Sequence, residues 1–222
     1  MNNNCLFLWI LGSPRSGTTF ITDFIGKFTD KSYNEPWQTH PLNEAHSWKF
    51  PPAKNIVFKY CENWKNIEII LSRFKNNHFI HVWRNPDNVI NSMAFPKYDS
   101  YPPRNLYGNF KEDQIRVKLC MERWYSNIIH SMSLYKLMPN NYHEIQYEKP
   151  KKGLLSLSNK LNLNLNLETL KYKSKNVKSN LDWDLHPQAK KLRNLIMKYN
   201  DETSLVEFIK QNKPHLLTRV LF

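Results

Sequence analysis

Short apolar runs alternate with amphipathic stretches along most of this chain of 222 residues. Continuous apolar runs such as CLFLWIL, over residues 5–11, are typical of strands covered on both faces of a parallel sheet. Apolar residues that recur every four positions, as Phe20, Phe24 and Phe28 do, predict a helix. The predicted strands are 5–11, 55–60, 78–83 and 143–147, and the predicted helices are 16–28, 63–74, 86–93, 112–138, 153–163, 187–199 and 202–211.

This order of elements predicts an α/β fold in three layers, with a doubly wound, mainly parallel sheet between two layers of helices. The length fits one domain, residues 1–222, with a sizeable core. Residues 95–110 are rich in Pro, Tyr and Asn and have no period, which predicts a loop. Ligands of such folds bind at the carboxyl ends of the strands. We expect regions 36–50 and 95–110 to line the pocket for a substrate.

The net charge and the cysteine content limit the classes of binding partner and the cellular compartment that we expect. The formal net charge of +13 favours an anionic partner, but the basic residues are spread along the chain, so no nucleic acid is expected. The three cysteines have neither metal-binding nor redox spacing, which indicates a reducing, cytoplasmic compartment. The run 5–11 is too short for a membrane span, which needs about 20 apolar residues. It also lacks the flanks of a signal peptide.

The stretch GSPRSGTTF, residues 12–20, lies where an α/β fold binds phosphate: after an apolar strand and before a helix. Gly12 and Gly17 have the spacing of a Walker A loop. However, Thr18 occupies the position of the Walker lysine, and the cation is instead Arg15. No apolar run that ends in a magnesium-binding Asp follows. The stretch therefore predicts an anion-binding loop that does not work as a magnesium-dependent NTPase does.

A second element, HVWRNPDNVINSM over residues 81–93, carries two further anion-binding groups. Arg84 leaves a predicted strand, and its guanidinium can direct two donors onto one phosphate. Ser92 follows eight residues later on the predicted helix and can add a hydroxyl. The pairing of this element with the first loop is far more specific than either element alone.

These two elements resemble the 5′-phosphosulfate loop and the 3′-phosphate motif of sulfotransferases that use 3′-phosphoadenosine 5′-phosphosulfate (PAPS). VFKYCEN (57–63), IQYEKP (145–150) and the Trp of ERWYSN (122–127) also fit the family pattern. The resemblance covers about residues 5–150. It implies a P-loop NTPase-like sulfotransferase fold. The form SPRSGTT is similar to that of the bacterial and the carbohydrate- or tyrosine-directed branches.

The resemblance also implies roles for individual residues. Lys59 would stabilise the sulfuryl oxygens or the leaving phosphate, and Arg15 would contribute to catalysis as well as to binding. Phe20 would lie against the adenine and Tyr147 would contact the nucleoside. The lysines of 171–180 either close over the 3′-phosphate or form a solvated surface. The 5′-phosphosulfate would be held by Arg15, Ser16, Gly17, Thr18 and Thr19, and the 3′-phosphate by Arg84 and Ser92.

One departure from the family concerns the general base. Cys61 occupies the position at which cytosolic members carry a catalytic His, and a neutral thiol is a poor proton acceptor. Glu35, in YNEPWQTH, is our preferred base, because a Glu in this region serves that role in tyrosine-directed and many bacterial relatives. His40, His46 and Glu62 are the alternatives.

The sequence thus predicts in-line transfer of a sulfuryl group from PAPS to a hydroxyl or amine, without a metal. The acceptor would be a small molecule, a carbohydrate or a peptide. Fixed positioning and electrostatic stabilisation would supply most of the catalysis. The alternatives are a P-loop-type nucleotide-dependent kinase, or a protein that binds a nucleotide or nucleic acid without turnover.

Overall fold

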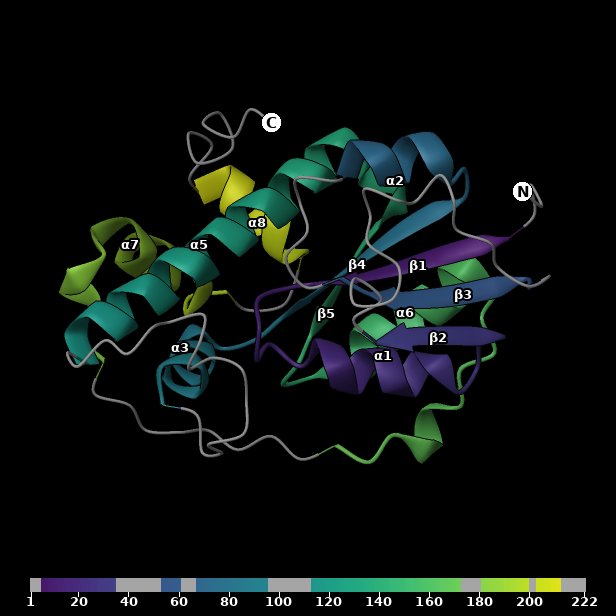
Figure 1. Ribbon diagram of the computed structural model, residues 1–222, viewed down its shortest axis with the longest axis horizontal. Helices are drawn as coiled ribbons and strands as arrows, with labels where there is room; N and C mark the ends of the chain where they lie inside the picture. The colour runs from purple at the N-terminus through teal and green to yellow at the C-terminus, as the bar shows by residue number, and fades with distance from the viewer. Residues whose placement is uncertain are drawn as a thin grey trace.

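The structure, a computed structural model, describes residues 5–34, 53–60, 67–95, 113–172, 181–199 and 203–212. Within these ranges five strands form one parallel sheet in the order β2-β3-β1-β4-β5, and Figure 1 shows helices on both of its faces. The strands are β1 (Leu6–Leu11), β2 (Lys31–Asn34), β3 (Asn55–Lys59), β4 (Asn77–Trp83) and β5 (Tyr142–Gln146).

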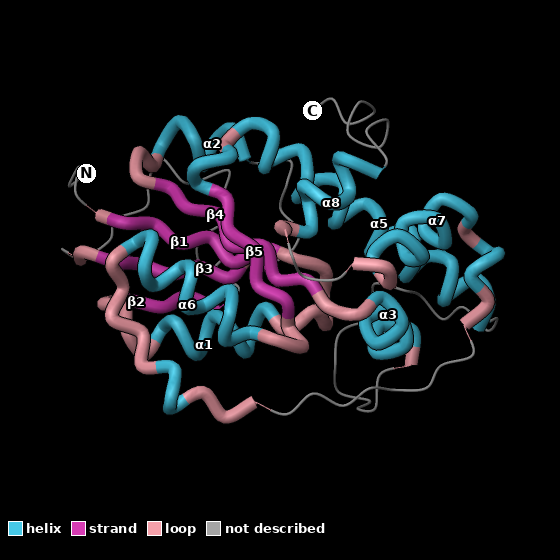
Figure 2. The backbone as a smooth tube through the Cα atoms, turned by 180° about the vertical axis from the view of Figure 1, so that it is seen from behind, coloured by secondary structure: helices cyan, strands magenta, loops and turns pink. Residues whose placement is uncertain are grey.

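The helices form the two outer layers, so the predicted three-layer α/β fold is confirmed. Helices α1 and α6 cover one face of the sheet, and α2, α5 and α8 cover the other (Figure 2). The helices are α1 (Thr18–Gly26), α2 (Ile67–Arg73), α3 (Pro86–Ala94), α5 (Asp113–Leu137), α6 (Pro150–Leu161), α7 (Pro187–Ile196) and α8 (Leu205–Asn212); the 3-10 turns are η4 (Pro139–Asn141), η5 (Leu167–Thr169) and η6 (Trp183–Leu185).

The central strand β1 is buried along its whole length, which explains its unbroken apolar run. Successive side chains of a strand point to opposite faces, and here both faces are covered. Trp9 stacks on Phe58 of β3, with ring centroids 4.5 Å apart, in the core under α2 and α5. Phe7, Trp9 and Leu11 belong to that core, whereas Leu6, Leu8 and Ile10 pack in the core under α1 and α6.

The structure differs from the predicted elements at β2 and at the start of α1, and the ends of α6, α7 and α8 differ by one to three residues. The sequence pattern missed β2, because its residues KSYN are mostly exposed at the edge of the sheet and contain no apolar run. Helix α1 begins at Thr18 rather than at residue 16, because Arg15 and Gly17 have positive φ angles of 69° and 99°. The predicted loop 95–110 lies outside the described residues except for Phe95.

Candidate functional site

The turn between β1 and α1 takes a shape that only glycine permits at two positions. Gly12 has φ 149°, and a Cβ there would lie 2.3 Å from the carbonyl oxygen of Val82 on the neighbouring strand. Gly17 has φ 99°, and a Cβ there would lie 2.0 Å from Cδ2 of Tyr147. The turn is therefore packed against β4 and against the end of β5, which brings distant parts of the sequence to one place.

The same turn leaves polar groups that an anion would satisfy. Gly17 caps α1 without a side-chain hydrogen bond, and no acidic residue occupies the first turn of the helix. The N–H groups at a helix N-terminus and the helix dipole both favour a negative charge. The hydroxyls of Ser13 and Ser16 are buried and have no hydrogen-bond partner among the described residues. Buried polar groups normally have partners, so these hydroxyls fit an anion held in the turn.

Lys59 brings a buried cation to this turn. It is the last residue of β3 and pairs with Ile10 of β1, so its side chain leaves the sheet at the carboxyl edge. Lys59 is only 5% exposed, and its Nζ donates to Oγ of Thr19 at 2.8 Å. A buried ammonium group needs negative or polar partners. The structure thus brings together Lys59 and Thr19, to which the family resemblance gave roles in one site.

The two predicted anion-binding elements meet at Arg15. Its Nε donates to Oγ of Ser92 on α3 at 2.9 Å, although the two residues are 77 positions apart. Nη1 of Arg84 donates to the carbonyl oxygen of Arg15 at 3.2 Å. Two guanidinium groups and one hydroxyl therefore lie together at the start of α1, where the carboxyl ends of β1 and β4 meet.

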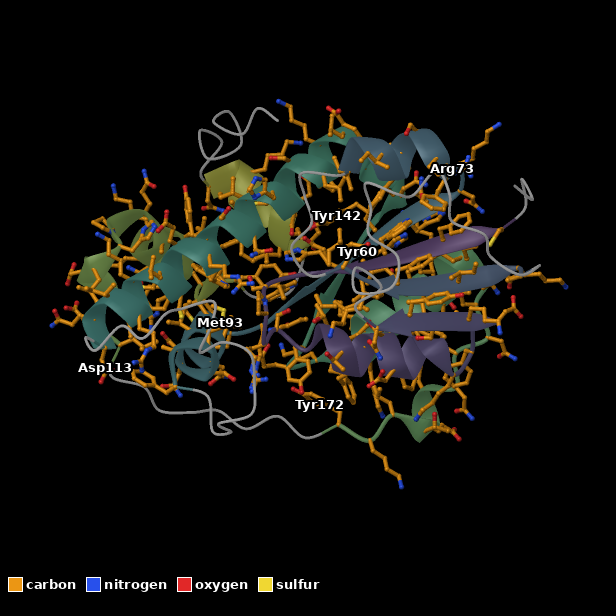
Figure 3. The ribbon with its side chains drawn as sticks, viewed as in Figure 1. Tyr60, Arg73, Met93, Asp113, Tyr142 and Tyr172 are labelled. Atoms are coloured by element: carbon orange, nitrogen blue, oxygen red, sulfur yellow. The ribbon has the colours of Figure 1, made fainter. Side chains whose placement is uncertain are left out.

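Three aromatic rings form a cluster beside these cations. The ring centroids of Phe20 and Tyr147 are 5.9 Å apart, and Tyr172 lies 5.9 Å from the first and 5.3 Å from the second. Figure 3 shows Tyr172 beside the start of α1. Sequence reasoning missed Tyr172, because it treated the stretch from 171 onward only as a run of lysines. Tyr172 is the single aromatic residue of the stretch 171–180, and this was the signal that could have drawn attention to it.

The turn that carries Arg84 is held by a carboxylate that sequence reasoning also passed over. Oε1 of Glu148 accepts a hydrogen bond from the backbone N–H of Asn85 at 3.0 Å and lies 3.8 Å from Nε of Arg84. Asn85 in turn caps α3, since its side chain accepts from the backbone N–H of Asp87 at 2.9 Å. Glu148 directly follows Tyr147 in the stretch IQYEKP. The sequence analysis thus included this residue in the family pattern but gave it no role.

Helix α3, which carries Ser92, is fixed to the C-terminal part of the chain through Asp87. Arg193 of α7 donates to both carboxylate oxygens of Asp87, from Nε at 2.8 Å and from Nη2 at 2.7 Å. Nε1 of Trp183 donates to the same carboxylate at 2.8 Å. Residues 183 and 193, which lie beyond the part of the chain that the resemblance covers, thereby help to position the second anion-binding element.

Several predicted site residues lie outside the described residues. These include the preferred base, Glu35, and its alternatives, His40, His46 and Glu62. The first described range ends at Asn34, one residue before Glu35, and Asn34 pairs with Lys59 at the carboxyl end of β2. The lysines at 173, 175 and 178 and both predicted acceptor-lining regions also lie outside, apart from Phe95.

A cavity of about 260 Å³ lies elsewhere, beside β5 and the start of α8. Glu144 and His143 line it, and burial raises the pKa of Glu144 to about 7 and lowers that of His143 to about 3. Both oxygens of Glu144 accept backbone N–H groups of α8, at 2.8 and 3.1 Å. The cavity shares none of the residues of the predicted site, so it does not bear on the anion-binding turn.

Across the described ranges, no cluster of three or more His, Cys, Asp or Glu side chains could hold a metal ion. The helices described are also too short or too polar to cross a membrane.

Comparison with known proteins shows which solved structures share this fold. No protein-family model matches the sequence, and no curated protein matches it. Among solved structures, the chain is similar to mouse sulfotransferase SULT7A1 complexed with PAP, with a TM-score of 0.58 and 16% identity over 93% of this chain and 88% of that one. It is also similar to the sulfotransferase domain from the curacin biosynthetic pathway, with a TM-score of 0.52 and 16% identity over 94% and 97% of the two chains. The chain has the sulfotransferase fold, as the resemblance implied.

Proposed function

We propose that this chain is an enzyme that transfers a sulfuryl group from PAPS to a hydroxyl or amine and releases 3′-phosphoadenosine 5′-phosphate (PAP). The observation that carries the proposal is the meeting of Arg15 with both Arg84 and Ser92. At this junction the loop expected to bind the 5′-phosphosulfate meets the element expected to bind the 3′-phosphate, as a 3′,5′-bisphosphorylated nucleotide would require. The sulfotransferase fold and the neighbour complexed with PAP support it.

The binding roles follow from the geometry of the turn. The N-terminus of α1 and the buried hydroxyl of Ser16 would hold the 5′-phosphosulfate, together with Arg15, Gly17, Thr18 and Thr19. Arg84 and Ser92 would hold the 3′-phosphate. The nucleoside would lie against Phe20 and Tyr147, and we add Tyr172 because its ring completes the same cluster.

In the reaction, the acceptor oxygen or nitrogen forms a bond to sulfur as the bond from sulfur to the 5′-phosphate oxygen breaks. Negative charge then accumulates on the leaving phosphate and the sulfuryl oxygens, and fixed cations aimed at that charge lower the barrier. We assign this role to Lys59 and Arg15, which would act without a metal. The acceptor is a small molecule, a carbohydrate or a peptide.

We propose Glu35 as the group that takes the acceptor's proton. Strand β2 ends at Asn34, which pairs with Lys59, so the chain reaches residue 35 at the carboxyl edge of the sheet. We also place the enzyme in a reducing compartment, the cytoplasm, since Cys5 and Cys120 are buried free thiols.

A thermal-shift comparison tests the nucleotide. PAP, at about 100 times its dissociation constant, should stabilise the chain by roughly 2.7 kcal/mol. ATP and GTP at the same concentration, with and without magnesium, should stabilise it less. A larger shift with magnesium and ATP than with PAP would favour the kinase alternative instead.

A further inference from the structure

Arg84 is held on three sides in the described part of the chain. Its Nη1 donates to the carbonyl oxygen of Arg15, and its guanidinium lies over the ring of Tyr147, 4.8 Å from the ring centroid. On the third side, Oε1 of Glu148 lies 3.8 Å from Nε. Both side chains of this ion pair are largely buried, at 16% and 17% exposed.

The ion pair of Arg84 and Glu148 lacks hydrogen bonds that its atoms could make. Nε of Arg84 and Oε2 of Glu148 are both buried and have no hydrogen-bond partner among the described residues. A distance of 3.8 Å is an ion pair but too long for a hydrogen bond. That distance joins Nε to Oε1, the oxygen that already accepts from Asn85, and a carboxylate can accept further hydrogen bonds. A buried charged group without its hydrogen bond is costly, so a small movement of Arg84 toward the carboxylate of Glu148 would complete the contact.

The fold fixes Glu148 in this position. The backbone N–H of Tyr147 donates to the carbonyl oxygen of Trp83 at 2.8 Å, which continues the pairing of β4 and β5 beyond the ends of the strands. Residues 84 and 85 therefore lie beside residue 148. The hydrogen bond from Asn85 to Oε1 holds the carboxylate while the other oxygen stays available.

We propose that Glu148 is a positioning residue that makes this site selective for nucleotides with a 3′-phosphate. When such a ligand binds, Nε of Arg84 donates to Glu148 while the terminal nitrogen atoms of the guanidinium face the 3′-phosphate. Glu148 thus sets the plane of Arg84 and does not itself touch the phosphate. This inference rests on the proposed function, because it takes the 3′-phosphate as the ligand of Arg84.

The proposal makes the opposite prediction from simple charge repulsion. A carboxylate close to a phosphate repels it, so removal of the negative charge should by itself strengthen phosphate binding. If Glu148 instead positions Arg84, its neutralisation leaves a buried guanidinium without a counter-charge and free to turn away. The binding of a 3′-phosphate then weakens. The sign of the change therefore separates the two accounts.

The experiment compares PAP with AMP, which lacks the 3′-phosphate, by isothermal titration at a fixed salt concentration. The variants are Glu148→Gln, Arg84→Ala and the double variant. Glu122→Gln, an exposed carboxylate on α5, is the matched control. Glu148→Gln keeps an oxygen for the N–H of Asn85, and thermal unfolding shows whether it folds. Glu148→Asp keeps the charge but withdraws it from Arg84, so it replaces the Gln variant if that protein does not fold.

We expect Glu148→Gln to weaken PAP binding at least tenfold and to leave AMP binding within twofold, with a smaller loss in the same direction for Glu148→Asp. In the Arg84→Ala background, Glu148→Gln should cause no further loss, because Glu148 acts through Arg84. Unchanged or tighter PAP binding, equal losses for PAP and AMP, or a full loss in the Arg84→Ala background would each overturn the proposal. If the wild-type chain does not prefer PAP to AMP, the proposed function itself fails.

Discussion

Replacing Gly17 by alanine tests whether the turn before α1 packs against Tyr147 as the structure has it. The substitution has two separate effects. At φ 99°, an L side chain strains the backbone, which costs about 1–3 kcal/mol. The new Cβ would also lie 2.0 Å from Cδ2 and 2.3 Å from Cε2 of Tyr147, so the ring must move.

Displacement of a packed ring typically costs a further ~1–3 kcal/mol. The total loss for Gly17→Ala is therefore about 2–6 kcal/mol. At roughly 2–4 °C per kcal/mol for a chain of this size, the unfolding midpoint should fall by at least about 4 °C. PAP binding should weaken as well, because Tyr147 supports both Phe20 and Arg84.

Chemical denaturation of four proteins separates the two effects: wild type, Gly17→Ala, Tyr147→Ala and the double variant. Tyr147→Ala removes the ring, so the double variant keeps the backbone strain but not the clash. Its loss of unfolding free energy should be smaller than the sum of the single losses by about 1–3 kcal/mol. If the single losses add to within about 0.5 kcal/mol, the two residues are not in contact and the packing of the turn is wrong.

Four further predictions address binding, catalysis and stability. Arg84→Ala should weaken PAP binding by roughly 1.5–3 kcal/mol but AMP binding much less, by titration calorimetry; equal losses would rule out the 3′-phosphate role. Glu35→Gln should lower turnover at least 100-fold, the low end for general-base catalysis, with little change in PAP affinity; near-normal turnover would mean that the base is another residue. Sulfuryl transfer should survive EDTA, and a strict magnesium requirement would contradict the metal-free mechanism. Burial lowers the pKa of His81 and of His143 to about 3. Below pH 6.5 the unfolded chain therefore binds more protons at these two sites than the folded chain does. The free energy of unfolding should decrease as the pH is lowered, by up to about 1.4 kcal/mol per pH unit for each histidine. The raised pKa of Glu144 opposes one of the two histidines between about pH 4.5 and 7, so His143→Gln should remove most of the slope in that range. A flat stability curve for the wild-type chain would refute this account.

The fold was largely predictable because its central strands are buried on both faces. The run over residues 5–11 had to be apolar throughout, since each side chain packs in one core or the other. The edge strand β2 gave no such signal. It is short and exposed, and its pairing with β3 depends on hydrogen bonds that the amino-acid sequence does not display.

Candidate site residues could be chosen from the sequence where the residue type itself indicates the chemistry, but not where a residue matters because of its neighbours. Arg15, Arg84 and Ser92 stood out because one cation follows each of two predicted strands and a hydroxyl lies on the helix after the second. Glu148 and Tyr172 did not, because their importance comes from what lies beside them: the guanidinium of Arg84 for the first and two aromatic rings for the second. The pattern of one sequence carries no information on such contacts.

Transfer of labelled sulfate is the most direct test of the proposed activity. The chain would be incubated without metal with PAPS that carries ³⁵S, and with phenols, tyrosine peptides, sugars and amines in parallel. The account predicts that label moves to at least one acceptor class and that PAP appears in equal amount, with both strongly reduced in Arg84→Ala when PAPS is below saturation. If PAPS stays intact with every class while magnesium and ATP support transfer of the γ-phosphate to any of them, the chain is a kinase and the account is wrong.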